Sequence, residues 1–147
     1  MTGDALERLR ALLPGAQVAT PATIATASDA KGAYVLLAHL DAAQELAIRG
    51  RAWPLGAGWH FYVGSARGPG GMRARLRRHF RPDKRPHWHI DRLTIAADAM
   101  LALTLEGGVE CDIVATLAGS GWFGAILPGF GSSDCSRCSS HLLVSLG

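Results

Sequence analysis

The segment at residues 61–91, FYVGSARGPGGMRARLRRHFRPDKRPHWHID, constrains this chain more than any other. It begins like the apolar end of a strand, passes through a glycine-rich loop and enters a run dense in arginine. Residues 67–92 contain nine Lys or Arg and two Asp, a net charge of +7 in a chain whose net charge is +3. A basic segment on a remainder of charge −4 indicates that the protein binds a polyanion.

The alternative is a solvated cationic face, the usual role of a run of charges. The glycine loop and the aromatic residues that share the segment weaken this alternative. The residues in question are His79, His87, Trp88 and His89.

The length and composition indicate one globular domain. The chain has 147 residues, of which 48% are hydrophobic and 18% charged, enough to bury a core. No apolar run approaches the length needed to cross a bilayer, and the first residues lack the layout of a secretory signal. Three cysteines, an odd number, suit a reducing compartment better than a disulfide framework. We therefore expect a cytoplasmic protein.

The hydrophobic pattern predicts an α+β fold with a small, mostly antiparallel sheet of three to four strands flanked by helices. Leucines at helical spacing predict a helix at residues 3–13, and the following small polar residues are interpreted as a connector. Residues 32–40 form a nearly continuous apolar run, which favours a buried strand. Further strands are predicted at residues 45–56, 58–66 and 99–105. The tail at residues 128–146 is predicted as a loop followed by a short apolar strand. The further helices are predicted at residues 72–80, 87–97 and 106–119.

Five residues in these elements could carry out chemistry. The only two tyrosines, Tyr34 and Tyr62, come from two strands that could pair and bring both phenols to one sheet end. Arg75 and His79 are four residues apart and share a helix face, where a guanidinium could bind phosphate and an imidazole could transfer a proton. Glu110 could hold a hard divalent cation. Taken singly, each residue is explained as well by packing or by an exposed position.

The order of these motifs resembles the GIY-YIG nuclease superfamily. The chain has a Gly-x-Tyr strand, a Tyr-x-Gly strand entering a glycine turn, a basic helix and a later helical glutamate. The phrases YVGSARGPGG, HWHID and GFGSSDC are similar to those of a small single-domain Uri-type subfamily. The resemblance spans roughly residues 32 to 146. It implies an N-terminal helix and connector at residues 1–31 and a GIY-YIG-like nuclease domain at residues 32–147.

The resemblance implies a metal-dependent endonuclease that hydrolyses phosphodiester bonds in DNA, which is favoured over RNA, with Mg²⁺ or Mn²⁺ as the cofactor. Tyr34 and Tyr62 would be the active-site tyrosines, either one the base, and Arg75 would bind the phosphate. His79 would be the histidine one turn later, and Glu110 would bind the metal. We predict the nucleic-acid contacts at Arg67, Arg73, Arg77, Arg78, Lys84, Arg85, His87 and His89.

Two features of the sequence keep alternatives open. Ser65 stands where several members of the superfamily have a lysine, so the protein could be an inactive nucleic-acid-binding module of the same fold. The tail offers a second alternative, a zinc-stabilised interaction domain, because its spacing resembles that of zinc ligands. The candidate zinc ligands are Cys111, Cys135, Cys138 and His141.

Overall fold

A computed structural model of the chain describes residues 2–48, 50–130 and 140–146. The helices are α1 (Thr2–Leu12), α2 (Gly71–Phe80), α3 (His89–Ala96) and α4 (Glu110–Gly119), with a 3-10 turn η1 (Ile24–Thr26). The strands are β1 (Gln17–Ala19), β2 (Gly32–Leu40), β3 (Gln44–Ile48), β4 (Arg51–Leu55), β5 (Gly58–Ala66), β6 (Ala99–Glu106), β7 (Phe123–Ala125) and β8 (Leu142–Ser145). No helix in the described ranges has the length and apolar character that a membrane span requires.

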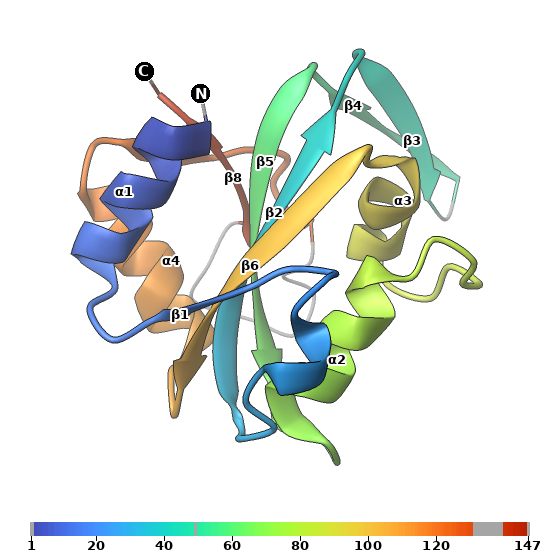
Figure 1. The fold of residues 1–147 in the computed structure, drawn as a ribbon. Helices are drawn as coiled ribbons and strands as arrows, with labels where there is room; N and C mark the ends of the chain where they lie inside the picture. Colours follow the sequence, from blue (N-terminus) through green and yellow to red (C-terminus); the bar gives the residue numbers. More distant parts are fainter. Residues whose placement is uncertain (1, 49, 131–139, 147) are drawn as a thin grey trace.

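The described strands form a six-stranded antiparallel sheet in the order β1-β6-β2-β5-β8-β7 and a separate hairpin of β3 and β4 (Figure 1). The predicted α+β class and antiparallel sheet are therefore confirmed. The sheet is wider than three to four strands because β1 and β7, three residues each, pair at its two edges. Such short segments carry too few residues to show a strand pattern.

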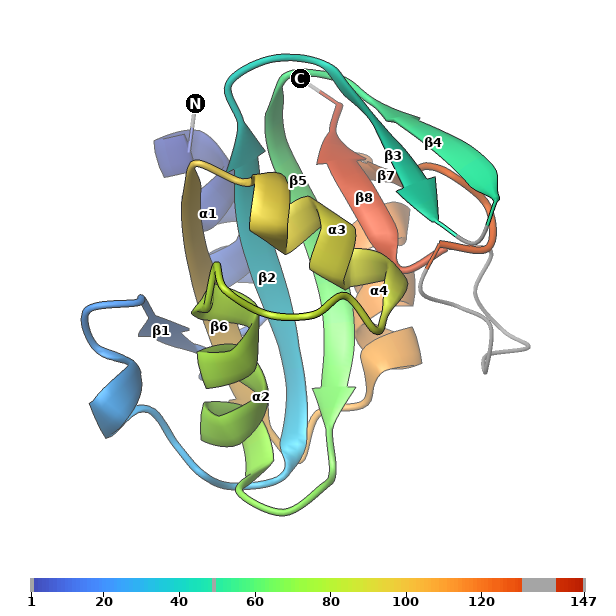
Figure 2. The ribbon, with the colours of Figure 1, turned by 90° about the vertical axis from the view of Figure 1, so that its right-hand side faces the viewer.

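The central strand β2 is apolar at almost every position because it is covered on both faces. Tyr34, Leu36 and Leu40 belong to the core on the side of α2, α3 and the hairpin. Val35 and Leu37 belong to the core on the side of α1 and α4. Figure 2 shows α2 and α3 packed on one face of the sheet. A strand buried on both faces loses the apolar–polar alternation of a half-exposed strand.

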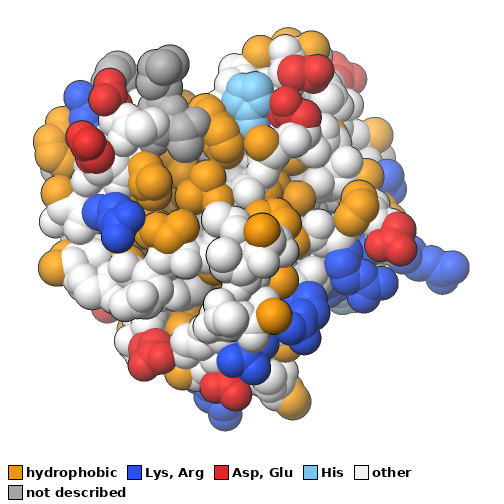
Figure 3. All heavy atoms as spheres, viewed as in Figure 1, with side chains coloured by type: hydrophobic (Ala, Val, Ile, Leu, Met, Phe, Trp, Pro, Cys, Tyr) orange, Lys and Arg blue, Asp and Glu red, His pale blue; other side chains and the backbone are white. Residues whose placement is uncertain are grey.

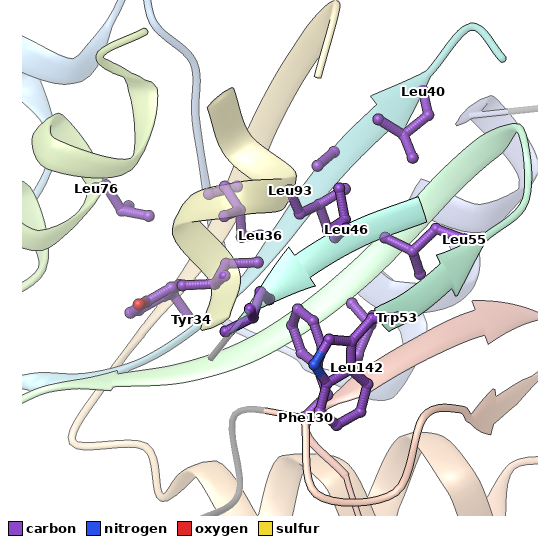
Figure 4. Packing of buried hydrophobic residues seen from close by; sticks show 14 of the residues in the cluster. Tyr34, Leu36, Leu40, Leu46, Trp53, Leu55, Leu76, Leu93, Phe130 and Leu142 are labelled. Atoms are coloured by element: carbon purple, nitrogen blue, oxygen red, sulfur yellow. The ribbon is translucent and has the colours of Figure 1, made fainter. Parts of the chain in front are cut away.

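Residues 45–56, predicted as one strand or a hairpin arm, form both arms of the β3–β4 hairpin. Leu46 pairs with Trp53 in register, and both side chains are buried. Leu55 continues this inward face and belongs to the same core cluster as Leu40 and Leu93 (Figure 4). The alternating pattern therefore reflects a hairpin with one buried face. This hairpin covers the core instead of extending the main sheet.

The segment at residues 16–30, predicted as a connector, contributes β1 and η1 to the fold. Val18 in β1 pairs with Leu103 of β6 at the sheet edge. The preceding helix α1 buries Leu9 completely in the core shared with α4. Residues before Gly32 therefore complete one face and one edge of the same sheet.

Candidate active site

The site lies at the end of the sheet where β2 begins and β5 ends. In the antiparallel register Tyr34 is opposite Gly64, and Leu36 is opposite Tyr62. Tyr34 and Tyr62 are therefore diagonal neighbours on one face of the sheet, the face covered by α2. The tertiary arrangement brings together the two phenols that are 28 residues apart in the chain.

The glycine of the second motif has a steric role. A Cβ atom on Gly64 would lie 2.5 Å from the Tyr34 hydroxyl oxygen and 2.6 Å from the adjacent ring carbon. Gly32 has a comparable constraint, since its Cβ would lie 2.3 Å from the backbone oxygen of Leu105. The Gly-x-Tyr and Tyr-x-Gly pattern thus allows the strands to approach and leaves room for the Tyr34 ring.

A buried hydrogen bond joins Tyr34 to α2. The Tyr34 hydroxyl oxygen is 2.6 Å from Nε2 of His79, and both residues are at most 1% exposed. Burial above all raises the pKa of Tyr34 well above its usual value, and burial lowers the pKa of His79 to about 3. The phenol is therefore protonated and the imidazole neutral near pH 7, so the phenol O–H can donate to Nε2.

Tyr62 is the more accessible of the two tyrosines. It is half-buried, and its ring lies edge-on to that of His79 at a centroid separation of 6.4 Å. Burial raises its pKa above the usual value, and the negative charge of Glu110 raises it further, while the positive charge of Arg75 lowers it. Tyr62 is therefore also a protonated phenol in the free protein.

Arg75 contacts both Tyr34 and the ring of Trp88. Its guanidinium carbon is 4.6 Å from the centre of the Trp88 ring, a distance typical of a cation–π contact. Its charge and a side-chain hydrogen bond lower the pKa of Tyr34 against the larger effect of burial. Arg75 is half-buried, so its guanidinium is partly accessible to a ligand.

Trp88 is held in place by a carboxylate that sequence reasoning missed. Asp91 is fully buried and accepts two hydrogen bonds from the Arg78 guanidinium, at 2.6 and 2.9 Å. It also accepts the backbone N–H groups of His87 and Trp88, at 2.7 and 2.8 Å. These bonds lower the pKa of Asp91 despite its burial. An aspartate three residues into a helix after a Trp is the only local signal of this role.

Seven of the eight predicted nucleic-acid contacts fall into two groups, and His89 stands apart from both. In the first group the side chain is bound within the protein: Arg78 to Asp91, Arg67 to the Gly108 carbonyl, Arg73 to the Ala27 carbonyl, and Lys84 to the carbonyls of His79 and Arg81. In the second group, Arg77, Arg85 and His87 are exposed. His89 packs its ring against Trp53 and Phe130. Figure 3 shows Lys and Arg side chains gathered along the edge formed by α2 and the loop after it.

Glu110 begins α4 and faces the same sheet end. Its side chain is 30% exposed, and its charge reaches both tyrosines, whose pKa values it raises. One carboxylate oxygen is 3.5 Å from Nδ1 of His141, which precedes β8. A partly exposed carboxylate beside open solvent fits a hard divalent cation that keeps most of its water ligands.

Two of the four candidate ligands of the zinc alternative lie outside the described residues. Cys111 is buried in α4, whereas Cys135 and Cys138 lie outside the residues that the structure describes. Within the described part of the chain, no group of three or more His, Cys, Asp or Glu side chains is placed to hold a metal ion.

Comparison with known proteins gives one family. No curated protein and no solved structure matches the chain. The family model described as "Domain of unknown function DUF123" matches residues 33–146, from the residue before Tyr34 to the residue after β8. This range includes Tyr34, Tyr62, Arg75, His79 and Glu110 and covers more than half of the chain. The chain therefore belongs to the DUF123 family.

Proposed function

We propose that this protein is a divalent-metal-dependent nuclease of the GIY-YIG type that hydrolyses phosphodiester bonds in DNA. The observation that supports it is the convergence of Tyr34, Tyr62, Arg75, His79 and Glu110 at one end of the sheet, from β2, β5, α2 and α4. These residues supply two hydroxyl groups, one fixed cation and one carboxylate, the groups expected of a site for phosphoryl chemistry.

Arg75 binds a non-bridging oxygen of the scissile phosphate in this mechanism. A guanidinium stacked on Trp88 is pre-oriented, and it stabilises the negative charge that develops at phosphorus. Its charge also favours the ionised forms of both phenols. A bound phosphate partly neutralises Arg75, so the tyrosines remain protonated unless a further positive charge enters the site.

We assign to Tyr62 the role of contacting and activating the attacking water, because Tyr62 is half-buried whereas Tyr34 is fully buried. Tyr34 and His79 form a hydrogen-bonded pair that holds the sheet against α2 and positions Tyr62, whose ring contacts His79. With a pKa of about 3, His79 serves as a hydrogen-bond acceptor and not as a proton donor near pH 7.

Glu110 would hold the divalent cation, with water completing the coordination. The cation would supply positive charge, which would lower the pKa of Tyr62 and stabilise the negative charge of the phosphate. Glu110 itself raises the pKa of Tyr62, so neutralising its charge shifts that pKa in the direction catalysis needs.

The test is cleavage of labelled linear, branched and single-stranded DNA with Mg²⁺ or Mn²⁺. We expect Glu110→Gln to reduce cleavage by several orders of magnitude while DNA affinity stays similar or rises, because one negative charge leaves the site. Glu45→Gln is the matched control: Glu45 is an exposed carboxylate on the remote β3–β4 hairpin. Arg75→Ala should abolish cleavage and also weaken binding.

Cleavage in the presence of chelator, or at the wild-type rate in Glu110→Gln, would reject this active site. The second candidate, an inactive DNA-binding module, is favoured by one observation. Burial raises the pKa of both tyrosines, and Ser65 supplies no neighbouring cation to lower it. This candidate predicts DNA binding without cleavage under any metal condition.

A further inference from the structure

His141 is a buried histidine whose ring nitrogens have no hydrogen-bond partner within the described residues, although Nδ1 lies at ion-pair distance from Glu110. The residue is 2% exposed, and neither ring nitrogen has a hydrogen-bond partner. Its backbone is fixed, because its N–H donates to the Phe130 carbonyl at 3.1 Å and its carbonyl accepts from Val63 at 2.9 Å. A rigid, buried imidazole without hydrogen bonds is costly to a fold, which points to a ligand bound at its ring.

The nearest acidic group is Glu110, whose Oε2 is 3.5 Å from Nδ1 of His141. This separation is longer than a charge-assisted hydrogen bond, which is about 2.7–2.9 Å. It is close to the separation of two donor atoms bound to the same cation. Metal–nitrogen and metal–oxygen bonds of about 2.1 Å place two donor atoms about 3.0 Å apart at an octahedral angle and about 3.4 Å apart at a tetrahedral angle.

The donor set also indicates the kind of cation. Mg²⁺ is bound by oxygen donors, whereas imidazole favours divalent transition metals such as Mn²⁺, Fe²⁺ and Zn²⁺. One imidazole and one carboxylate leave the other coordination positions to water or phosphate oxygens. Glu110 is 30% exposed, so such ligands can reach this side of the site.

We propose that His141 and Glu110 together bind one divalent transition-metal cation, with Mn²⁺ bound in preference to Mg²⁺. The inference rests on the proposed function in placing the cation at Glu110, and it adds a second protein ligand that determines which cation is bound. His141 was considered above as a zinc ligand with the tail cysteines, whereas here it belongs to the site at the sheet end.

The test is a titration of the full chain with Mn²⁺ alone, without DNA. Binding is monitored by the electron paramagnetic resonance signal of the Mn²⁺ that remains free. Competition with Mg²⁺ gives the affinity for the second cation. We expect His141→Ala to weaken Mn²⁺ binding by about 10-fold or more, because losing even an outer-shell partner of a metal ligand costs about 10- to 100-fold in affinity. Mg²⁺ binding should change less than about three-fold, so the preference for Mn²⁺ is lost. His39→Ala removes a histidine near the other end of β2, where its Nδ1 contacts Asp98, and should change neither affinity.

A wild-type measurement covers the case in which His141→Ala does not fold. Mn²⁺ at a small fraction of the protein concentration should broaden the ring proton resonances of His141 strongly. The ring of His60, buried at the opposite end of β5, should be affected far less. Broadening of both rings to the same extent would overturn the inference.

The outcomes separate this inference from the proposed function. If Glu110→Gln abolishes Mn²⁺ binding but His141→Ala leaves the Mn²⁺ to Mg²⁺ preference unchanged, Glu110 is the protein ligand and His141 is not. The inference then fails while the proposed function stands. If wild-type protein binds neither cation, with or without DNA, both fail. Loss of the Mn²⁺ preference in His141→Ala supports the inference even in a protein that does not cleave.

Discussion

Asp91→Asn is expected to destabilise the protein strongly, because the carboxylate is the centre of a buried network. Its side chain is fully buried and accepts four hydrogen bonds, two from Arg78 and two from backbone N–H groups. An asparagine has one acceptor oxygen, so its NH₂ group must face a donor: the Arg78 Nη1, 2.6 Å from Oδ1, if the oxygen keeps the Oδ2 position. Arg78 then loses its buried counter-charge.

Breaking a buried ion pair by removing one partner costs about 3–5 kcal/mol. For a chain of this size, about 2–4 °C of midpoint is lost per kcal/mol, so the thermal midpoint should fall by about 6–20 °C. Urea unfolding followed by circular dichroism measures the free energy directly. Asp83→Asn is the matched control, since its ion pair with Arg81 is exposed and 3.7 Å long, and should cost less than about 1 kcal/mol.

The pH dependence gives a second measure of the same group. The folded-state pKa of Asp91 is lowered below that of the unfolded chain. Its stabilising contribution is therefore fully present above the unfolded pKa and is lost as pH falls through the folded pKa. Asp91→Asn should remove this acid-dependent part of the stability. If Asp91→Asn is no more destabilising than Asp83→Asn, the buried network is not a major source of stability and the reasoning is refuted.

Three further predictions follow from the site. Gly64→Ala should cost about 1–3 kcal/mol in urea unfolding, because the new Cβ would lie 2.5 Å from the Tyr34 hydroxyl; an unchanged midpoint would contradict this packing. His79 should stay neutral in NMR titrations down to about pH 4, and its contribution to stability should fall as pH drops from 6.5 towards 3, because only the unfolded chain takes up the proton there; a titration near pH 6.5 would refute its burial. Arg77→Glu should weaken DNA binding and flatten its salt dependence, whereas Arg10→Glu on α1 should have little effect; equal effects would exclude the α2 edge as the binding surface.

Local pattern was sufficient to predict most of the elements. The run at residues 32–40 has no polar face, which identifies a strand covered on both sides. Met72 and Leu76 define the buried stripe of α2 on an otherwise basic helix, and the glycines before them mark its start. Such signals depend on residues within one or two turns of each other, so one sequence contains them in full.

The tertiary structure alone decided which side chains meet. The register of β2 against β5 places Gly64 over Tyr34 and Tyr62 diagonally beside it, and a shift of β5 by one residue would turn Tyr62 to the face opposite Tyr34. Nothing near His141 in the sequence indicates that its ring lies beside Glu110, 31 residues earlier.

The edge strands of the sheet and the position of α3 also depend on tertiary contacts. β1 and β7 are strands because an exposed sheet edge offers them hydrogen-bond partners, not because three residues have a strong preference. Asp91 can bind Arg78 and hold the backbone at Trp88 only when α3 packs beside Arg78. Local sequence therefore specified most of the elements and the candidate chemical groups, whereas long-range pairing in the folded chain set the edge strands and the distances, burial and pKa values of those groups.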